Sequence, residues 1–473
     1  MTAMNTKHRL EPSPTTKPTR EGSDNYLIIA HPSENKILIA SDGTGHSSLP
    51  LIRIPENGPW WEVGRLTKLV NDEIKIQTSV LRCVAGDDNL TQAGARVYTL
   101  EAHSIPESLG ENVRWVARKE ATEQSNLPEN HRALLNAWFT ESETGQYPIT
   151  RAPWARPGWF ASAIGFAKQT LSERNSSLLE VQQQRTWERS SVIKLATSEG
   201  PMCLKACPSM YAFEPVLTQM LAKRFPLNTP EVIQINEQKK LLLMRWITGR
   251  PLSESREIKM WESALSVFAE MQIGFIDDTA KLKEIGCTDL ATSGLSTKFL
   301  KLVSDRDTML IGRTGGLTSD EAKKIDSLSL KIERACANLS ALGIPDSFEH
   351  GDFRAEHILV DNGCPIIFDL SNTVVTHPFF SAVQMIDFEN AAESLPGHLN
   401  ARSRLLKSYL EPWTSKFGPM EQLIEGFEIA RPLAALKEGL IRATVNLPHL
   451  EHREKWEFMI PYWMKKFIEL SKS

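Results

Sequence analysis

A chain of 473 residues is too long for one ordinary hydrophobic core, so we expect two or three folded units. Hydrophobic residues make up 41% of the chain and charged residues 24%, as in globular proteins, and a net charge of −4 gives no general attraction to nucleic acid or to an anionic membrane. The cysteines include no CxxC pair, which favours reduced thiols in a cytoplasmic protein. No apolar stretch reaches the length of a membrane span. We therefore expect a cytoplasmic protein whose partners include neither nucleic acid nor a membrane.

The N-terminal third is predicted to be a tail followed by a small α+β module. Residues 1–24 are polar and proline-rich, which indicates a disordered tail and not a signal peptide. Within residues 25–142, YLIIA and KILIA predict a hairpin around HPSEN, SVLRCVA and ARVYTLEAHS predict strands, and HRALLNAWFTE predicts an amphipathic helix. The order of these elements resembles a Nudix domain, but the glutamate-rich helix with which that family holds magnesium is missing. We interpret the module as non-catalytic and leave open that it binds a protein partner.

The next segments predict a second mixed region and then a mainly helical one. In residues 143–250 the sequence favours a strap GQYPITRAPWARPGW, a helix near 160–171, strands at 191–196 and 201–206 joined by TSEG, a helix at 213–224 and the apolar strand LLLMRWI. Residues 251–473 are mainly helical. There, Thr318 and Glu321 form a predicted capping box for a helix that runs to about residue 342.

The chemistry is concentrated in the run EHGDFRAEHILVDNGCPIIFDLSNTVVTHPFF, which holds two aspartates in different settings. Asp352 lies in a tight HGD loop, and Asp369 ends an apolar strand. Between them ILV, the turn DNG and PIIF predict a hairpin that can bring both carboxylates to one place. Phosphoryl transfer needs such a pair, because one carboxylate orients a hydroxyl and another holds magnesium on the nucleotide phosphates.

This combination of HGD, hairpin, terminal aspartate and HPFF resembles the catalytic and metal loops of the aminoglycoside/choline phosphotransferase family, which is kinase-like. The resemblance covers roughly residues 150–470. It implies an α+β fold class, with a two-lobed protein-kinase-like domain made of an N-lobe (143–250) and a C-lobe (251–473). It also implies ATP and Mg²⁺ as cofactors and a small-molecule hydroxyl as phosphoryl acceptor. Asp352 would be the base or hydroxyl-orienting group and Asp369 a metal ligand.

The same resemblance assigns residues that would hold the nucleotide. Lys205 in MCLKAC matches the lysine on the α/β-phosphates, and Glu214, nine residues later, matches the glutamate that pairs with it. Ser190 and Ser191 could offer groups to phosphate, although no glycine-rich loop precedes them. Trp246 would lie near the adenine. The alternatives are a solvated strand lysine for Lys205 and a structural core residue for Trp246.

The pattern departs from the family at one position. Five residues after Asp352 the family places an asparagine on the metal, and this chain has His357. Magnesium prefers oxygen ligands, whereas Mn²⁺ tolerates imidazole better. His357 is therefore a candidate metal ligand or a structural histidine, and Glu356 or Arg354 could take over part of the phosphate site. The alternative function is a catalytically degenerate kinase-like binding or scaffold protein.

The acceptor is not specified by the sequence. A cationic acceptor would require acidic side chains, for which Asp387, Glu389 and Glu393 are candidates, although solvated helix charges explain them more simply. A protein kinase is disfavoured because THPFF stands where an activation loop ending in APE would begin.

Overall fold

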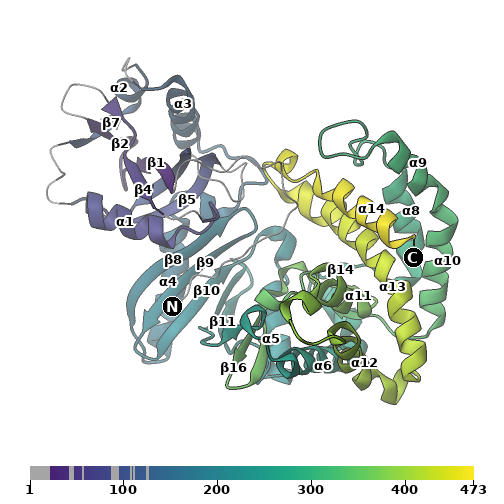
Figure 1. Cartoon of the computed structure of the whole chain (residues 1–473). Coiled ribbons are helices and arrows are strands. Elements are labelled where there is room, and N and C mark those ends of the chain that lie inside the picture. Colours follow the sequence, from purple (N-terminus) through teal and green to yellow (C-terminus); the bar gives the residue numbers. More distant parts are fainter. Residues whose placement is uncertain are drawn as a thin grey trace. The chain divides into compact units, whose positions relative to one another are not determined.

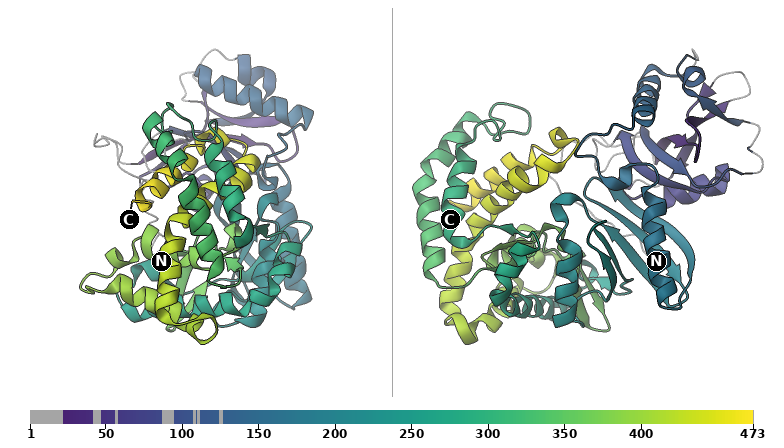
Figure 2. Two further views of the ribbon diagram at one scale, coloured as in Figure 1. Left: turned by 90° about the vertical axis from the view of Figure 1, so that its right-hand side faces the viewer. Right: turned by 180° about the vertical axis from the view of Figure 1, so that it is seen from behind.

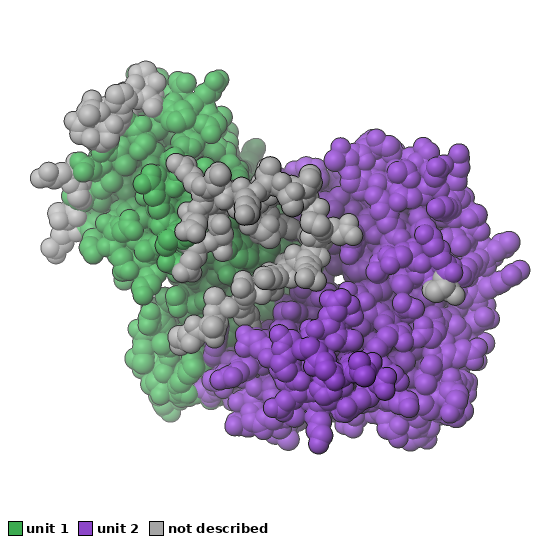
Figure 3. All heavy atoms as spheres, in the orientation of Figure 1, with its two compact units in different colours: residues 1–208 green, residues 209–473 purple. Residues whose placement is uncertain are grey.

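The computed structural model describes residues 22–472, except 42–46, 56–57, 87–94, 107–108, 110–111 and 124–126. Almost all of the predicted tail, residues 1–24, lies outside these ranges. The chain divides into two compact units, residues 1–208 and 209–473, which are coloured separately in Figure 3 and are described one at a time below. None of the helices within the described ranges combines the length and the apolarity needed to cross a membrane.

The first unit begins with a mixed seven-stranded sheet centred on β1, which pairs parallel with β6 and antiparallel with β2 and β4. The strands are β1 (Ser23–Ala30), β2 (Lys36–Ser41), β3 (Ser47–Ser48), β4 (Leu51–Ile54), β5 (Thr78–Ala85), β6 (Ala95–Ala102) and β7 (Val113–Ala117). The predicted β1–β2 hairpin and the strands β5 and β6 are confirmed.

Helices cover both faces of this sheet (Figure 1). Neighbouring residues of a strand point to opposite faces, so Leu27 of β1 packs in the core that includes Leu66 of α1 (Gly64–Ile74), and Ile28 packs in the core that includes Phe139 of α3 (Glu129–Thr144). The short helix α2 (Arg118–Glu123) precedes α3. The module is therefore a three-layered α/β/α sandwich, and its likeness to a Nudix domain stays a prediction.

The first unit ends with α4 (Trp159–Glu173) and three antiparallel strands, β8 (Leu178–Trp187), β9 (Ser190–Thr197) and β10 (Gly200–Ala206). The predicted hairpin of β9 and β10 is confirmed, and Val192 of β9 lies opposite Lys205 of β10. Sequence reasoning missed β8, because its EVQQQRTW segment lacks the apolar alternation that marks a strand. Glu101 of β6 holds the start of α4, since its Oε2 accepts the Gly158 N–H at 2.6 Å.

The second unit opens with α5 (Glu214–Arg224) and the hairpin β11 (Val232–Asn236)–β12 (Leu241–Arg245), and is then mainly helical (Figure 2). Its helices are α6 (Ile258–Gly274), α7 (Thr279–Glu284), α8 (Leu295–Ser304), α9 (Ser319–Ser327), α10 (Ser329–Ala341), α11 (Phe379–Val383), α12 (Ala401–Phe417), α13 (Met420–Ile441) and α14 (Met459–Leu470). The helix α6 packs on α12, and α13 packs on α14.

The helix predicted from Thr318 to about residue 342 is two helices. Its capping box is confirmed, because the Thr318 side chain accepts the Glu321 N–H while the Glu321 carboxylate accepts the Thr318 N–H. The chain then breaks at Leu328, between α9 and α10. The hydroxyls of Ser327 and Ser329 donate to backbone carbonyls three residues earlier. Such side-chain bonds compete with the helical ladder.

Two small sheets in this unit position the HGD region. One contains β13 (Arg250–Pro251), β16 (Ile358–Asp361) and β17 (Cys364–Ile367), and the other contains β14 (Thr288–Asp289), β15 (Ser347–Glu349) and β18 (Val374–Thr376). Because β15 pairs antiparallel with β18, Glu349 lies opposite Val374. The loop after β15 and the loop before β18 are thus neighbours, and these loops carry Asp352 and Asp369.

Candidate active site

The two predicted aspartates flank the imidazole of His357. The Nδ1 atom of His357 is 3.6 Å from Oδ2 of Asp352, and its Nε2 atom is 3.5 Å from Oδ2 of Asp369. The predicted hairpin β16–β17 makes this possible by pairing Ile358 with Ile367. The segments that precede and follow the hairpin are thereby held side by side.

Asp352 is held as an oriented, charged carboxylate. Its Oδ1 accepts a hydrogen bond from Nε2 of Gln384 at 3.2 Å and forms an ion pair with Nε of Arg354 at 2.8 Å. Burial by itself raises the pKa of Asp352, but Arg354 and then His357 outweigh it and keep the pKa well below the usual aspartate value. Asp352 is therefore an acceptor of hydrogen bonds at neutral pH and only a weak base.

Asp369 adopts a left-handed backbone conformation, which is uncommon for residues other than glycine. Its φ is 63°, in the left-handed region, where a side chain costs about 1–2 kcal/mol. The Ser371 hydroxyl donates to its Oδ1 at 3.0 Å. Strained residues of this kind persist where the surrounding structure holds them, and they are concentrated at functional sites.

The hydrogen bonding of His357 determines which ring nitrogen faces Asp369. Its Nδ1 lies 2.8 Å from the backbone carbonyl oxygen of Asp352. A carbonyl can only accept, so Nδ1 carries the proton, and in the neutral ring Nε2 keeps its lone pair. That lone pair then faces the Asp369 carboxylate. A cation bound between these two electron-rich atoms would be attracted to both.

His357 and Asp369 therefore fit a divalent cation. The described part of the chain contains no group of three or more His, Cys, Asp or Glu side chains arranged as metal ligands. Magnesium at nucleotide sites commonly uses one or two carboxylates together with phosphate and water oxygens. An imidazole ligand would favour Mn²⁺ over Mg²⁺. A cation bound here would supply positive charge against nucleotide phosphates.

The residues predicted to bind the nucleotide differ in burial and in their place in the fold. Lys205 is a buried residue of β10, and Ser190 and Ser191 begin β9, all in the first unit. The Ser190 hydroxyl accepts the Trp187 indole N–H at 3.0 Å, so it is already engaged. In the second unit Glu214 is the first, fully buried residue of α5, and the half-buried Trp246 follows β12. Their roles toward a nucleotide stay predictions.

Sequence reasoning missed Gln384, whose side chain holds Asp352. Gln384 begins a five-residue π-helical turn, Gln384–Phe388, which has no local sequence signal. Asp387 is neither solvated nor available to an acceptor, because it is buried between Arg402 at 2.7 Å and Arg431 at 3.1 Å.

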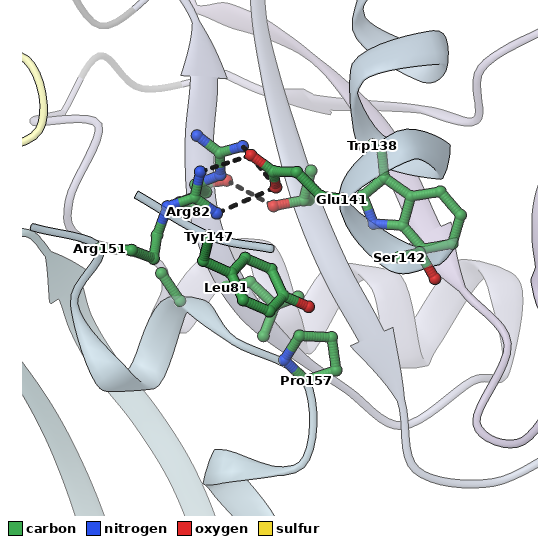
Figure 4. A pocket seen from close by; sticks show the side chains of 10 residues that line it. Leu81, Arg82, Trp138, Glu141, Ser142, Tyr147, Arg151 and Pro157 are labelled. Atoms are coloured by element: carbon green, nitrogen blue, oxygen red, sulfur yellow. Dashed lines mark hydrogen bonds and ion pairs between the residues drawn. The ribbon is translucent and has the colours of Figure 1, made fainter. Parts of the chain in front are cut away.

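A shallow hollow lies in the first unit (Figure 4). Glu141 of α3 is one of the residues that line it, and Arg151 donates to both carboxylate oxygens of Glu141, at 2.6 and 3.0 Å. Arg82 of β5 donates to the same carboxylate at 3.2 Å. Both oxygens of Glu141 are thus occupied by guanidinium groups. The cluster is explained by attachment of the predicted strap, which carries Arg151, to the sheet.

No protein-family model and no curated protein sequence matches the chain. Several solved structures resemble it. They include a choline/ethanolamine kinase family protein from Mesorhizobium loti (13% identity, TM-score 0.43, 66% of this chain and 95% of that one). A choline kinase from Streptococcus pneumoniae is also similar (13%, 0.44, 66% and 100%), as is a macrolide 2′-phosphotransferase from Brachybacterium faecium (16%, 0.42, 62% and 96%).

Proposed function

We propose that the protein is a metal- and ATP-dependent phosphotransferase that moves the γ-phosphoryl group to a hydroxyl of a small molecule. The observation that carries the proposal is the placement of Asp352 and Asp369 on opposite sides of His357, within 3.6 Å of its ring nitrogens. One carboxylate is tied to Gln384 and Arg354, and the other faces an imidazole lone pair. This division suits one carboxylate that orients a hydroxyl and another that binds a cation.

In this proposal Asp352 accepts the hydrogen bond of the acceptor hydroxyl and aims its oxygen at the γ-phosphorus. The low pKa of Asp352 suits a loose transition state, in which the hydroxyl loses its proton late and needs little base strength. Rate enhancement then comes mainly from positioning and electrostatics. Lys205 enters the proposal as a phosphate-binding residue and Glu214 as the residue that positions Lys205, both on the family pattern alone.

The proposal separates binding from chemistry and can be tested on that basis. Thermal unfolding of the purified protein should shift upward with ATP only when Mn²⁺ or Mg²⁺ is present, because a ligand that binds the folded state stabilises it. Asp369→Asn should lose this metal-dependent shift, while Asp352→Asn should keep it. Asp361→Asn, in the turn of the same hairpin, is the matched control. A scaffold protein that binds no nucleotide would show no ATP shift with either metal.

A further inference from the structure

A buried charge network joins α13 to the loop that carries Asp352. Glu349, the last residue of β15, is fully buried, and its Oε2 lies 3.1 Å from Nζ of Lys437 on α13. Lys437 is also fully buried and lies 2.5 Å from Oε1 of Glu438. The second oxygen of Glu438 is 3.3 Å from Arg442, one helical turn further on. Both carboxylates of this network are therefore paired, although neither reaches solvent.

The other oxygen of Glu349 holds the backbone just before Asp352. Its Oε1 accepts the N–H of Gly351 and the hydroxyl of Ser381, each at 3.0 Å. The oxygen of that hydroxyl accepts the N–H of His350, also at 3.0 Å. Two successive backbone N–H groups, at residues 350 and 351, are thus fixed by Glu349 directly or through Ser381. Asp352 is the next residue in the chain.

Stability alone does not account for such a network. Removing two charges from water is costly, and buried ion pairs can often be replaced by apolar side chains without loss of stability. An apolar side chain at position 349 could not, however, accept hydrogen bonds from Gly351 and Ser381. The carboxylate of Glu349 fixes the loop by accepting these hydrogen bonds. Lys437 neutralises the negative charge that Glu349 buries in the core.

We propose that Glu349 and Lys437 are positioning residues, which hold the Asp352 loop in its productive geometry through the backbone at residues 350–351. This inference rests on the proposed function for its effect on turnover. It goes beyond the HGD loop itself, because Lys437 lies 85 residues after Asp352, on a helix that carries none of the predicted site residues. Neither residue touches the reacting atoms.

Two double variants separate positioning from a merely structural role. Glu349→Gln with Lys437→Met removes both charges but keeps an amide oxygen that accepts from Gly351 and Ser381. Glu349→Leu with Lys437→Met removes the same charges and that acceptor as well. The glutamine variant should retain most of the wild-type kcat. The leucine variant should lose about 10²-fold in kcat at unchanged KM for ATP, because a displacement of about 1 Å at a reacting group has that cost.

Amide hydrogen exchange of the peptide around residues 348–354 provides a readout that does not depend on turnover. Protection should be kept in the glutamine variant and lost in the leucine variant. Equal kcat and equal exchange in the two variants would overturn the positioning role. If the exchange differs while the wild-type protein turns over no ATP, loop positioning stands and the proposed function fails.

Discussion

Replacing Gly351 with alanine tests how closely the loops that carry Asp352 and Asp369 must pack. Gly351 has φ of +75°, and a Cβ atom built on it would lie 2.0 Å from the backbone oxygen of Asn372, three residues after Asp369. A normal carbon–oxygen contact is more than about 3 Å, so the loops must separate by about 1 Å. Gly343 has φ of +68° with nothing within 4 Å of the built Cβ, and Gly343→Ala is therefore the matched control.

Both alanine variants pay the cost of the left-handed backbone, about 1–2 kcal/mol. Gly351→Ala adds the cost of displacing packed backbone, about 1–3 kcal/mol. We expect a loss of about 3 kcal/mol in the free energy of unfolding for Gly351→Ala, against about 1 kcal/mol for Gly343→Ala, as measured by urea denaturation. Turnover should fall about 10²-fold in the first variant only. Equal losses of stability and equal turnover in the two variants would refute the argument that the loops are in tight contact.

Two further outcomes follow from the same structure. His357→Asn should raise the ratio of Mg²⁺- to Mn²⁺-supported ATP turnover, since an amide oxygen replaces an imidazole beside Asp369; an unchanged ratio would exclude His357 as a ligand. Glu141→Gln in the first unit should lower stability by about 2–4 kcal/mol, because it leaves the buried Arg151 without its charged partner; an unchanged free energy of unfolding would contradict the importance of this ion pair.

The parts of the fold that could be predicted are those that depend on residues close together in the sequence. The hairpins β1–β2, β9–β10 and β16–β17 follow from apolar runs separated by turn residues, and the α9 cap follows from the spacing of Thr318 and Glu321. The strand β8 was missed because its many polar residues leave no alternation of apolar and polar side chains. The break of the long helix at Leu328 was missed because it depends on serine hydroxyls that bond to the backbone.

The candidate site was predicted only as far as it is local in sequence. Asp352, His357 and Asp369 are brought together by one short hairpin, so a motif could reveal them. Gln384 and Lys437 come from distant helices, and nothing in their immediate sequence marks the contacts that they make. Asp387 appeared as an exposed acidic residue, and only the tertiary fold places two arginines on it.

The structure shows which contacts the histidine makes at position 357, where the sequence resemblance leads us to expect an asparagine. Position 357 holds a ring whose Nδ1 is committed to the Asp352 carbonyl, so only Nε2 remains for a ligand. The same residue therefore contacts the backbone of the loop that carries Asp352 and faces the carboxylate of Asp369. An asparagine at this position would keep an oxygen for the metal but would have to replace that backbone bond with its amide N–H.

The most direct test of the central claim is the rate of ADP formation from ATP in Mn²⁺ by the wild-type protein, compared with Asp352→Asn. The account predicts slow, metal-dependent turnover that falls at least about 10²-fold in Asp352→Asn, while the ATP-dependent thermal shift persists. Equal ADP formation by the two proteins, or binding of ATP without any turnover by the wild-type protein, would contradict it.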